Sequence, residues 1–282
     1  MKTNIRLLAA MTALFGFTQC QKEVAISGTD LQQRVVSTDG SEQTASLTDN
    51  QRSYRKITLI YGRKQVLGQG TVRAFVKMSN YKGHQTVEEV GMAFSEAALV
   101  QLPHEAAVVL AIPDEAAPTH LKHIYLTFAQ EGHPPMNIYT VPHFDIHFYN
   151  TTSADRQTII PDDPRFFVNP PAGFLPATYV QEAAVPQMGM HWVDPASPEF
   201  HGERFTSTFI YGSLNGKVTF YEPMITLAHI LNTKSRYYPI LQATKFAQSG
   251  LYANEYGLRY NTEAHEHQVV LRDFRWASRS LN

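Results

Sequence analysis

The chain has 282 residues, 43% of them hydrophobic, which is enough for a substantial core in one or two domains. Its 24 basic and 25 acidic residues leave a formal net charge of −1, without the basic surplus typical of a nucleic-acid-binding protein. A single cysteine excludes an internal disulfide and a cluster of thiolate ligands. Frequent aromatic, proline and glycine residues favour many short strands over a helical bundle.

The first twenty residues resemble the signal of a bacterial lipoprotein. Lys2 and Arg6 are basic, and residues 5–17 form an apolar run too short to span a bilayer comfortably. Cys20 follows at the position where lipoproteins carry their lipid, although Gln19 stands where a small residue is usual. We therefore predict a signal peptide over residues 1–19 and membrane attachment through a lipidated Cys20. The alternatives are cleavage of an ordinary signal peptide next to an incidental cysteine, and an unprocessed anchor.

Residues 20–54 have the composition of a tether. They are rich in Ser, Thr, Gln, Asp and Gly and show little hydrophobic periodicity. This composition predicts a flexible link between the lipid and a folded domain. Together with the predicted lipid on Cys20, it places that domain in a bacterial cell envelope, on a periplasmic or surface face of a membrane.

From residue 55 onward, short apolar and β-branched runs alternate with period two and are separated by turns, a pattern typical of strands. We predict strands over residues 56–61, 71–78, 86–94, 108–112, 123–128, 143–149, 188–193, 205–212, 217–226, 256–260 and 267–274. Short helical segments are predicted over residues 95–99, 153–159 and 227–231, the first with Ser95 as its N-cap.

Turn signals support an antiparallel arrangement of these strands. Asn215 followed by Gly216 is a strong hairpin signal, because both residue types accept the positive φ of a type I′ turn. No repeat, low-complexity block or composition change interrupts residues 55–282. The sequence therefore predicts one mainly β domain over these residues, an antiparallel barrel or sandwich with one or two short helices.

The segment from Pro142 to Tyr149 carries the strongest chemical signal in the chain. In a strand, successive side chains point to opposite faces. The apolar face holds Phe144, Ile146 and Phe148, and the polar face holds His143, Asp145, His147 and Tyr149. Two imidazoles and a carboxylate in one row can hold a divalent cation.

The spacing of the two histidines limits how they could share an ion. In a regular strand, the backbones of His143 and His147 lie about 13 Å apart. Both could bind one ion only if the strand bends or bulges, or if they enclose the ion with Asp145 between them. Otherwise only one binds, and the other orients a ligand or acts as a base.

Two residues outside this strand complete the candidate site. His191 is on a predicted strand beside Gly189, where a missing side chain lets a ligand or another backbone approach closely. Glu222 is on the predicted face of Val218, Phe220 and Met224. A carboxylate on an apolar face costs several kcal/mol unless it is paired, protonated or bound to a cation.

We predict a divalent transition metal at this site, of which Zn, Mn and Fe are the leading choices and Ni and Cu also suit the ligands. Its predicted ligands are His143, His147, His191 and Glu222. Asp145 and His133 are predicted to orient a ligand or move a proton. Each histidine taken alone is better explained as a hydrogen-bonded core residue than as a ligand, and Glu222 could instead form an ion pair with Arg204 or Arg73.

Several strings together resemble a known family. They are residues 70–73, 95–103, 132–135, 141–149, 188–195, 197–200, 208–212 and 222–226. They resemble the TTHB-like family of bacterial envelope or secreted proteins, whose domain of unknown function was first described in Thermus, and the resemblance covers roughly residues 57–275. It implies a β-rich fold and no established activity. The family pattern includes His133, His143, Asp145, His147, His191 and Glu222 without giving them roles.

Three functions are compatible with these observations. The first is a metal-binding envelope protein whose ion activates a water or polarises a small-molecule substrate. The second is a non-catalytic module that captures a small molecule or a metal. The third is a structural envelope component, as a monomer or a homo-oligomer, in which the histidine row is a buried hydrogen-bond network.

Overall fold

The computed structural model describes residues 21–22 and 55–280. The predicted signal peptide, Cys20 and nearly all of the tether lie outside the described residues. Within the described part of the chain, no helix has both the length and the apolar character needed to cross a membrane.

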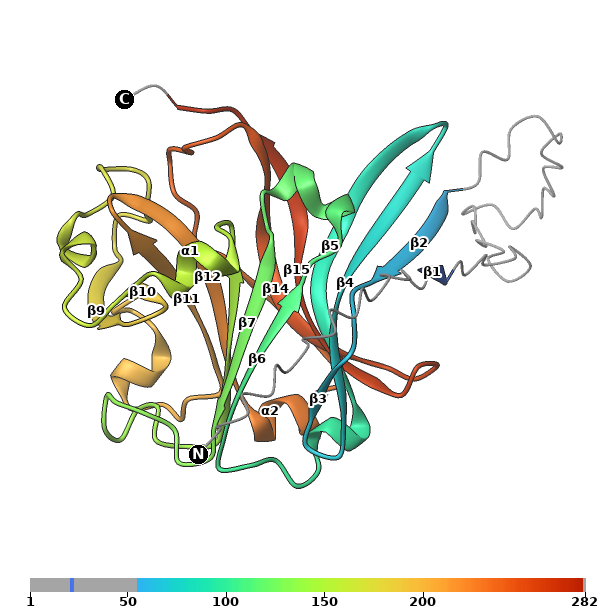
Figure 1. The fold of residues 1–282 in the computed structure, drawn as a ribbon, viewed down its shortest axis with the longest axis horizontal. Coiled ribbons are helices and arrows are strands. Elements are labelled where there is room, and N and C mark those ends of the chain that lie inside the picture. Colours follow the sequence, from blue (N-terminus) through green and yellow to red (C-terminus); the bar gives the residue numbers. More distant parts are fainter. Residues whose placement is uncertain (1–20, 23–54, 281–282) are drawn as a thin grey trace, which may run out of the picture.

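The fold consists of two antiparallel sheets, which confirms the prediction of a mainly β protein (Figure 1). One sheet has the order β1-β2-β4-β5-β15-β14-β13, with β3 paired to β4. Its strands are β1 (Gln21–Lys22), β2 (Lys56–Tyr61), β3 (Gln65–Leu67), β4 (Gly70–Tyr81), β5 (His84–Ser95), β13 (Ser235–Pro239), β14 (Gly250–Asn261) and β15 (Glu266–Ala277). We call it the first sheet.

The second sheet has the order β6-β7-β8-β12-β11-β10-β9. Its strands are β6 (Glu105–Ala111), β7 (His123–Ala129), β8 (His143–Tyr149), β9 (Val180–Val185), β10 (Gly189–Val193), β11 (Ser207–Leu214) and β12 (Lys217–Thr226). The helices are all short: α1 (Ser153–Gln157), α2 (Leu227–Asn232) and the 3-10 helices η2 (Glu96–Leu99), η3 (Asp114–Thr119), η4 (Pro164–Phe167) and η5 (Pro198–His201).

The main core lies between the two sheets, so the fold is a sandwich rather than a closed barrel. The apolar face of β8 points into this core, as predicted, and Phe144, Ile146 and Phe148 have no exposed surface. The ring of Phe144 packs 5.0 Å from that of Phe94 on β5 of the first sheet. Burial of these side chains fixes which face of β8 points away from the core.

The polar face of β8 is buried as well, because a second layer covers it. His143 and His147 are no more than 1% exposed. The covering layer contains a small apolar cluster whose members come from the 130–142 and 194–206 loops and from strands β10, β11 and β12. The histidine row therefore lies in a closed interior layer and not on a solvated sheet face.

Several local predictions are confirmed and others need correction. Asn215 and Gly216 form the β11–β12 turn with φ values of 50° and 75°. Ser95 precedes η2, but its hydroxyl accepts a hydrogen bond from the backbone N–H of Thr71 instead of capping that helix. The edge strands β9 and β13 were not predicted, since neither segment shows a clear apolar alternation. A register shift at Gly212 puts Val218 against the main core, away from the face of Glu222.

Candidate metal centre

Three neighbouring strands bring the first cluster of ligands together. The β8–β12 register pairs Asp145 with Met224 and Tyr149 with Phe220, so Glu222 lies beside His147. On the other side of β12, β11 pairs Ile210 with Glu222, and the next strand, β10, supplies His191. We call His147, His191 and Glu222 the inner cluster.

The ligand atoms of the inner cluster converge on one point. The Nε2 atom of His147 lies 3.5 Å from Oε1 of Glu222, and Nε2 of His191 lies 3.6 Å from Oε2. One ligand atom from each of the three residues lies within 4.8 Å of the other two. All three side chains are buried, with at most 8% of each exposed. The cluster can therefore hold a metal ion.

Backbone contacts fix the tautomer of both imidazoles. Nδ1 of His147 donates to the carbonyl of Tyr125, and Nδ1 of His191 donates to the carbonyl of Ala183. A neutral imidazole that donates through Nδ1 presents a lone pair at Nε2. In this state Nε2 of His147 and Oε2 of Glu222 are buried without a hydrogen-bond partner. Ligating histidines commonly use their second nitrogen in this way.

Burial sets the ionisation of the inner cluster. Loss of hydration lowers the pKa of His147 to about 3 and that of His191 to about 4, so both imidazoles are neutral at pH 7. Burial also raises the pKa of Glu222 well above its ordinary value, and the negative charge of Asp145 raises it further. The cluster thus offers two neutral nitrogen ligands and a carboxylate that lacks a compensating positive charge.

A glycine allows an aromatic ring to pack against both histidines. The ring of Phe220 lies 5.0 Å from the imidazole of His147 and 5.0 Å from that of His191. It passes over Gly212 of β11, where a β-carbon would overlap the ring. Gly189, which the sequence analysis singled out for close approach, packs near the carbonyl of Ser213 with a φ of 144°. The close neighbour at Gly189 is thus backbone of the same sheet.

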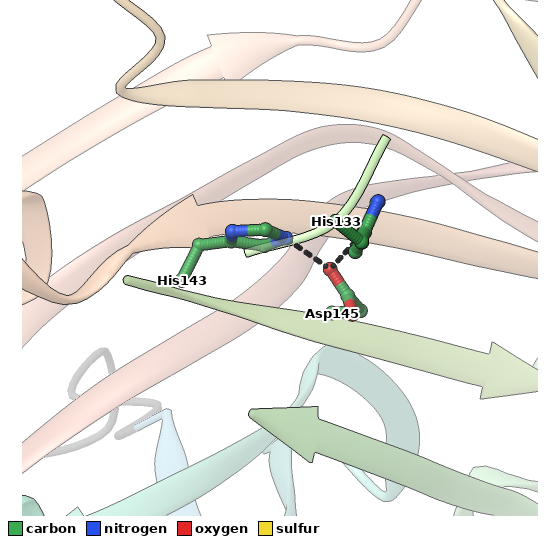
Figure 2. A group of neighbouring side chains, drawn as sticks. All are labelled: His133, His143 and Asp145. Atoms are coloured by element: carbon green, nitrogen blue, oxygen red, sulfur yellow. Dashed lines mark ion pairs between the residues drawn. The ribbon is translucent and has the colours of Figure 1, made fainter. Parts of the chain in front are cut away.

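A second group, the outer cluster, consists of His133, His143 and Asp145 (Figure 2). Nε2 of His143 lies 3.1 Å and Nε2 of His133 lies 3.5 Å from Oδ1 of Asp145. Each imidazole donates its Nδ1 hydrogen to a backbone carbonyl, that of Val141 for His143 and that of Pro134 for His133. These three ligand atoms also lie within 4.8 Å of one another.

The outer cluster has a different charge state from the inner one. Burial alone would raise the pKa of Asp145, but the imidazoles of His133 and His143 outweigh it and hold that pKa well below its usual range. Burial opposes protonation of His133, yet contact with Asp145 raises its pKa above the ordinary value. Thr127 also donates to Oδ2 of Asp145 over 2.9 Å. The carboxylate of the outer cluster therefore lies beside two imidazoles that favour its ionised form.

The structure divides the predicted ligands between the two clusters. It brings His147, His191 and Glu222 together and places His143 with Asp145 and His133. Strand β8 is regular along its whole length, without the bend or bulge that a shared ion would need. His143 and His147, four residues apart, therefore belong to different clusters. The alternative pairing of Glu222 with Arg73 is not formed, because Arg73 contacts Glu266 over 2.7 Å.

Sequence reasoning missed two titratable residues near the clusters. His123 lies in the predicted strand over residues 123–128 but was given no role; it begins β7, is buried and stacks on Tyr149 with ring centroids 4.8 Å apart. Glu182 of β9 lies close enough to His133 for the two charges to interact, while burial raises its own pKa. Its segment gave no signal, because its partner comes from a distant loop.

No family model, curated protein or solved structure matches the chain. The resemblance drawn from short strings in the sequence analysis remains a prediction. The inner and outer clusters are therefore the features from which function is inferred.

Proposed function

We propose that the protein binds a divalent transition-metal ion, Zn, Mn or Fe, through His147, His191 and Glu222. The observation that carries this proposal is the convergence of two Nε2 atoms and one carboxylate in a buried site, with both Nδ1 atoms already bonded to carbonyls. Such a donor set suits these ions, and a structure without the ion leaves buried polar atoms unpartnered.

The distances fit a metal site better than a hydrogen-bonded network. Zinc ligands lie about 2.1 Å from the ion, which separates neighbouring ligand atoms of a tetrahedral site by about 3.4 Å. The separations of 3.5 Å from His147 to Oε1 and 3.6 Å from His191 to Oε2 are close to this value, with each imidazole facing its own oxygen of Glu222. They are too long for strong hydrogen bonds, which would shorten them to about 2.9 Å.

Three protein ligands leave coordination positions for a water or a substrate oxygen. A bound ion would lower the pKa of that water or polarise a carbonyl or phosphoryl group. Asp145 lies two residues from His147 on the same face of β8, and its partner His133 is 40% exposed. We infer that Asp145 and His133 carry protons between this site and solvent. Together with the open coordination positions, this supports metal-assisted chemistry on a small molecule as the function.

Elemental analysis tests the metal proposal directly. The protein is produced without a histidine tag, and its metal content is measured beside those of Glu222→Gln and His191→Gln. We expect close to one ion per chain in the wild type and loss of that ion in both variants. Glu199→Gln is the matched control, since Glu199 is a buried carboxylate outside both clusters. A folded wild type that is metal-free and does not take up added Zn, Mn or Fe would refute the proposal.

A non-catalytic role at the same site is the second candidate, favoured by the very low exposure of His147 and Glu222. In that case the ion would have no position open to an external ligand. Substitution with cobalt distinguishes the two functions. A change in the visible absorption spectrum on addition of azide indicates an open position and supports catalysis. An unchanged spectrum indicates a closed site that stores the metal or stabilises the fold.

We further propose that the chain is held in a bacterial cell envelope by a lipid on Cys20. The basic start, the short apolar run and the single cysteine support this location. Mass spectrometry of the protein purified from membranes should find a chain that begins at Cys20 with added acyl mass. Cys20→Ala should release the protein from the membrane fraction. A mature chain without acyl mass would exclude lipid attachment.

A further inference from the structure

A cavity of about 400 Å³ lies between the two sheets, away from both clusters. Strands β11 and β12 of the second sheet and β14 and β15 of the first sheet contribute its walls. The 240–248 loop and the C-terminal residues Arg279 and Ser280 complete its rim. None of the six cluster residues lines it, so it is a separate site.

The inner walls of this cavity are mainly apolar. Phe209, Leu271 and Phe274 belong to or pack against the main core, and their side chains line the space between the sheets. A volume of 400 Å³ accommodates roughly a dozen heavy atoms, since a small molecular group occupies about 30 Å³ in a condensed phase. The cavity therefore has the size and walls suited to a short hydrocarbon chain.

The charged residues of the cavity lining are all cations. Lys217, Lys245 and Arg279 line it, and no aspartate or glutamate does. Lys217 and Arg279 are exposed and Lys245 is half-buried, so the positive charge lies toward the mouth. Within residues 55–280, none of these three cations forms an ion pair with a carboxylate. An anionic group on a ligand would supply the missing partner.

A tyrosine hydroxyl adds a polar contact inside the cavity. Tyr211 and Tyr252 also line it, and their hydroxyls donate to the carbonyls of Leu241 and Gln248. The hydroxyl of Tyr221 makes no hydrogen bond to another described residue. Tyr221 therefore retains a donor that an anionic or hydroxyl group of a ligand can use.

We propose that this cavity binds an amphipathic anion, namely a hydrocarbon chain of about ten carbons that ends in a carboxylate. The chain occupies the space between the sheets, and the carboxylate faces the three cations at the mouth. This inference is independent of the metal proposal, because the two sites share no residue.

Isothermal titration of the full chain with decanoate and with 1-decanol tests the proposal. The two probes have chains of the same length and differ in the charge of the head group. We expect saturable binding of one decanoate per chain and at least tenfold weaker binding of decanol. The triple variant Lys217→Gln/Lys245→Gln/Arg279→Gln should weaken decanoate binding at least tenfold and leave decanol binding unchanged. Lys64→Gln, an exposed lysine outside the cavity, is the matched control.

A cavity-filling variant tests the location. Ala253 lines the cavity and is half-buried, so Ala253→Phe should abolish binding of both probes while the melting temperature stays within a few degrees of that of the wild type. If Ala253→Phe fails to fold, the triple charge variant alone decides the question. The proposal is overturned if decanoate does not bind, if decanol binds equally well, or if decanoate affinity survives either the charge variant or a folded filled variant. None of these outcomes affects the metal proposal.

Discussion

Asp145 and His147 lie two residues apart on one face of β8, yet each completes a different cluster. Asp145 contacts His143 of its own strand and His133 of a loop, whereas His147 contacts Glu222 of the neighbouring strand β12. The charge of Asp145 nevertheless acts on the inner cluster, because it raises the pKa of Glu222. The two groups are therefore adjacent sites, and the charge of one affects the ionisation of the other.

Metal binding to the inner cluster should release a proton. Burial is the main cause that raises the pKa of Glu222 well above its usual value, and this favours the protonated carboxyl group in the metal-free protein. The imidazoles have lowered pKa values and contribute no proton at pH 7. Calorimetric titration with Zn at pH 7 in two buffers of different ionisation enthalpy should report about one proton released per ion.

The matched variant for this titration is Glu222→Gln, which has no proton to lose. We expect its residual Zn binding to be weaker by at least tenfold and independent of the buffer. Equal apparent enthalpies in both buffers for the wild-type protein would contradict a protonated Glu222.

Gly212→Ala should disturb the inner cluster through Phe220. The added β-carbon would overlap the ring of Phe220, which packs against the imidazoles of His147 and His191. We expect a loss of about 1 to 3 kcal/mol in the free energy of unfolding, measured with urea, together with weaker metal binding. Adding Phe220→Leu to this variant should recover part of both losses. If Gly212→Ala keeps wild-type stability and metal content, the ring does not position the histidines.

The part of the site that follows from local sequence was predictable. Period-two alternation assigned Phe144 and His147 to opposite faces of one strand, and the structure confirms both assignments. The placement of Glu222 among apolar side chains identified it as a carboxylate in need of a partner. The distance between His143 and His147 in an extended strand already argued against a shared ion.

The division into two clusters could not be predicted, because it depends on which strands are neighbours. His191 reaches Glu222 only because β11 lies between β10 and β12. His133 comes from a loop, and no periodic pattern indicates where a loop residue will lie. The register shift at Gly212, which moves Val218 to the other face, also arises from pairing between strands. Local sequence gives the faces of a strand, whereas the cross-strand partners are set by the whole sheet.

Acid should destabilise the fold through His123. Burial, followed by the charge of Arg156, lowers its pKa from 6.5 to about 4, so the folded protein favours the neutral imidazole. The stability that His123 contributes is complete above pH 6.5 and is lost as the pH falls toward 4. Between pH 6.5 and pH 5 this loss is about 1.6 kcal/mol. Urea unfolding of the metal-free protein at several pH values measures it.

The control for this prediction is His123→Phe, which keeps a ring against Tyr149 and cannot titrate. Its free energy of unfolding should fall less steeply with decreasing pH than that of the wild type, by at most about 1.4 kcal/mol per pH unit between pH 6.5 and pH 4. Parallel curves for the two proteins would show that His123 is already protonated in the fold, or that it titrates normally.

Asp145→Asn should lower the pKa of His133. Burial by itself pushes the pKa of this imidazole down, and contact with the carboxylate of Asp145 reverses the direction. Without that charge, burial still lowers the pKa of His133, and only weaker contacts raise it. The pKa should therefore fall below 6.5. Nuclear magnetic resonance of the imidazole signals, recorded on metal-free protein across a pH series, measures the midpoint of His133 directly.

The comparison variant is Glu182→Gln, because Glu182 is the other carboxylate that acts on His133 and has the smallest effect on its pKa. It should lower the midpoint much less than Asp145→Asn does. A midpoint unchanged in Asp145→Asn would mean that the two side chains do not share a proton, and the proposed proton route from the metal site would then lack its link to solvent. A large shift in Asp145→Asn alone would instead identify Asp145, 3.5 Å from His133, as the charge that raises the pKa of His133.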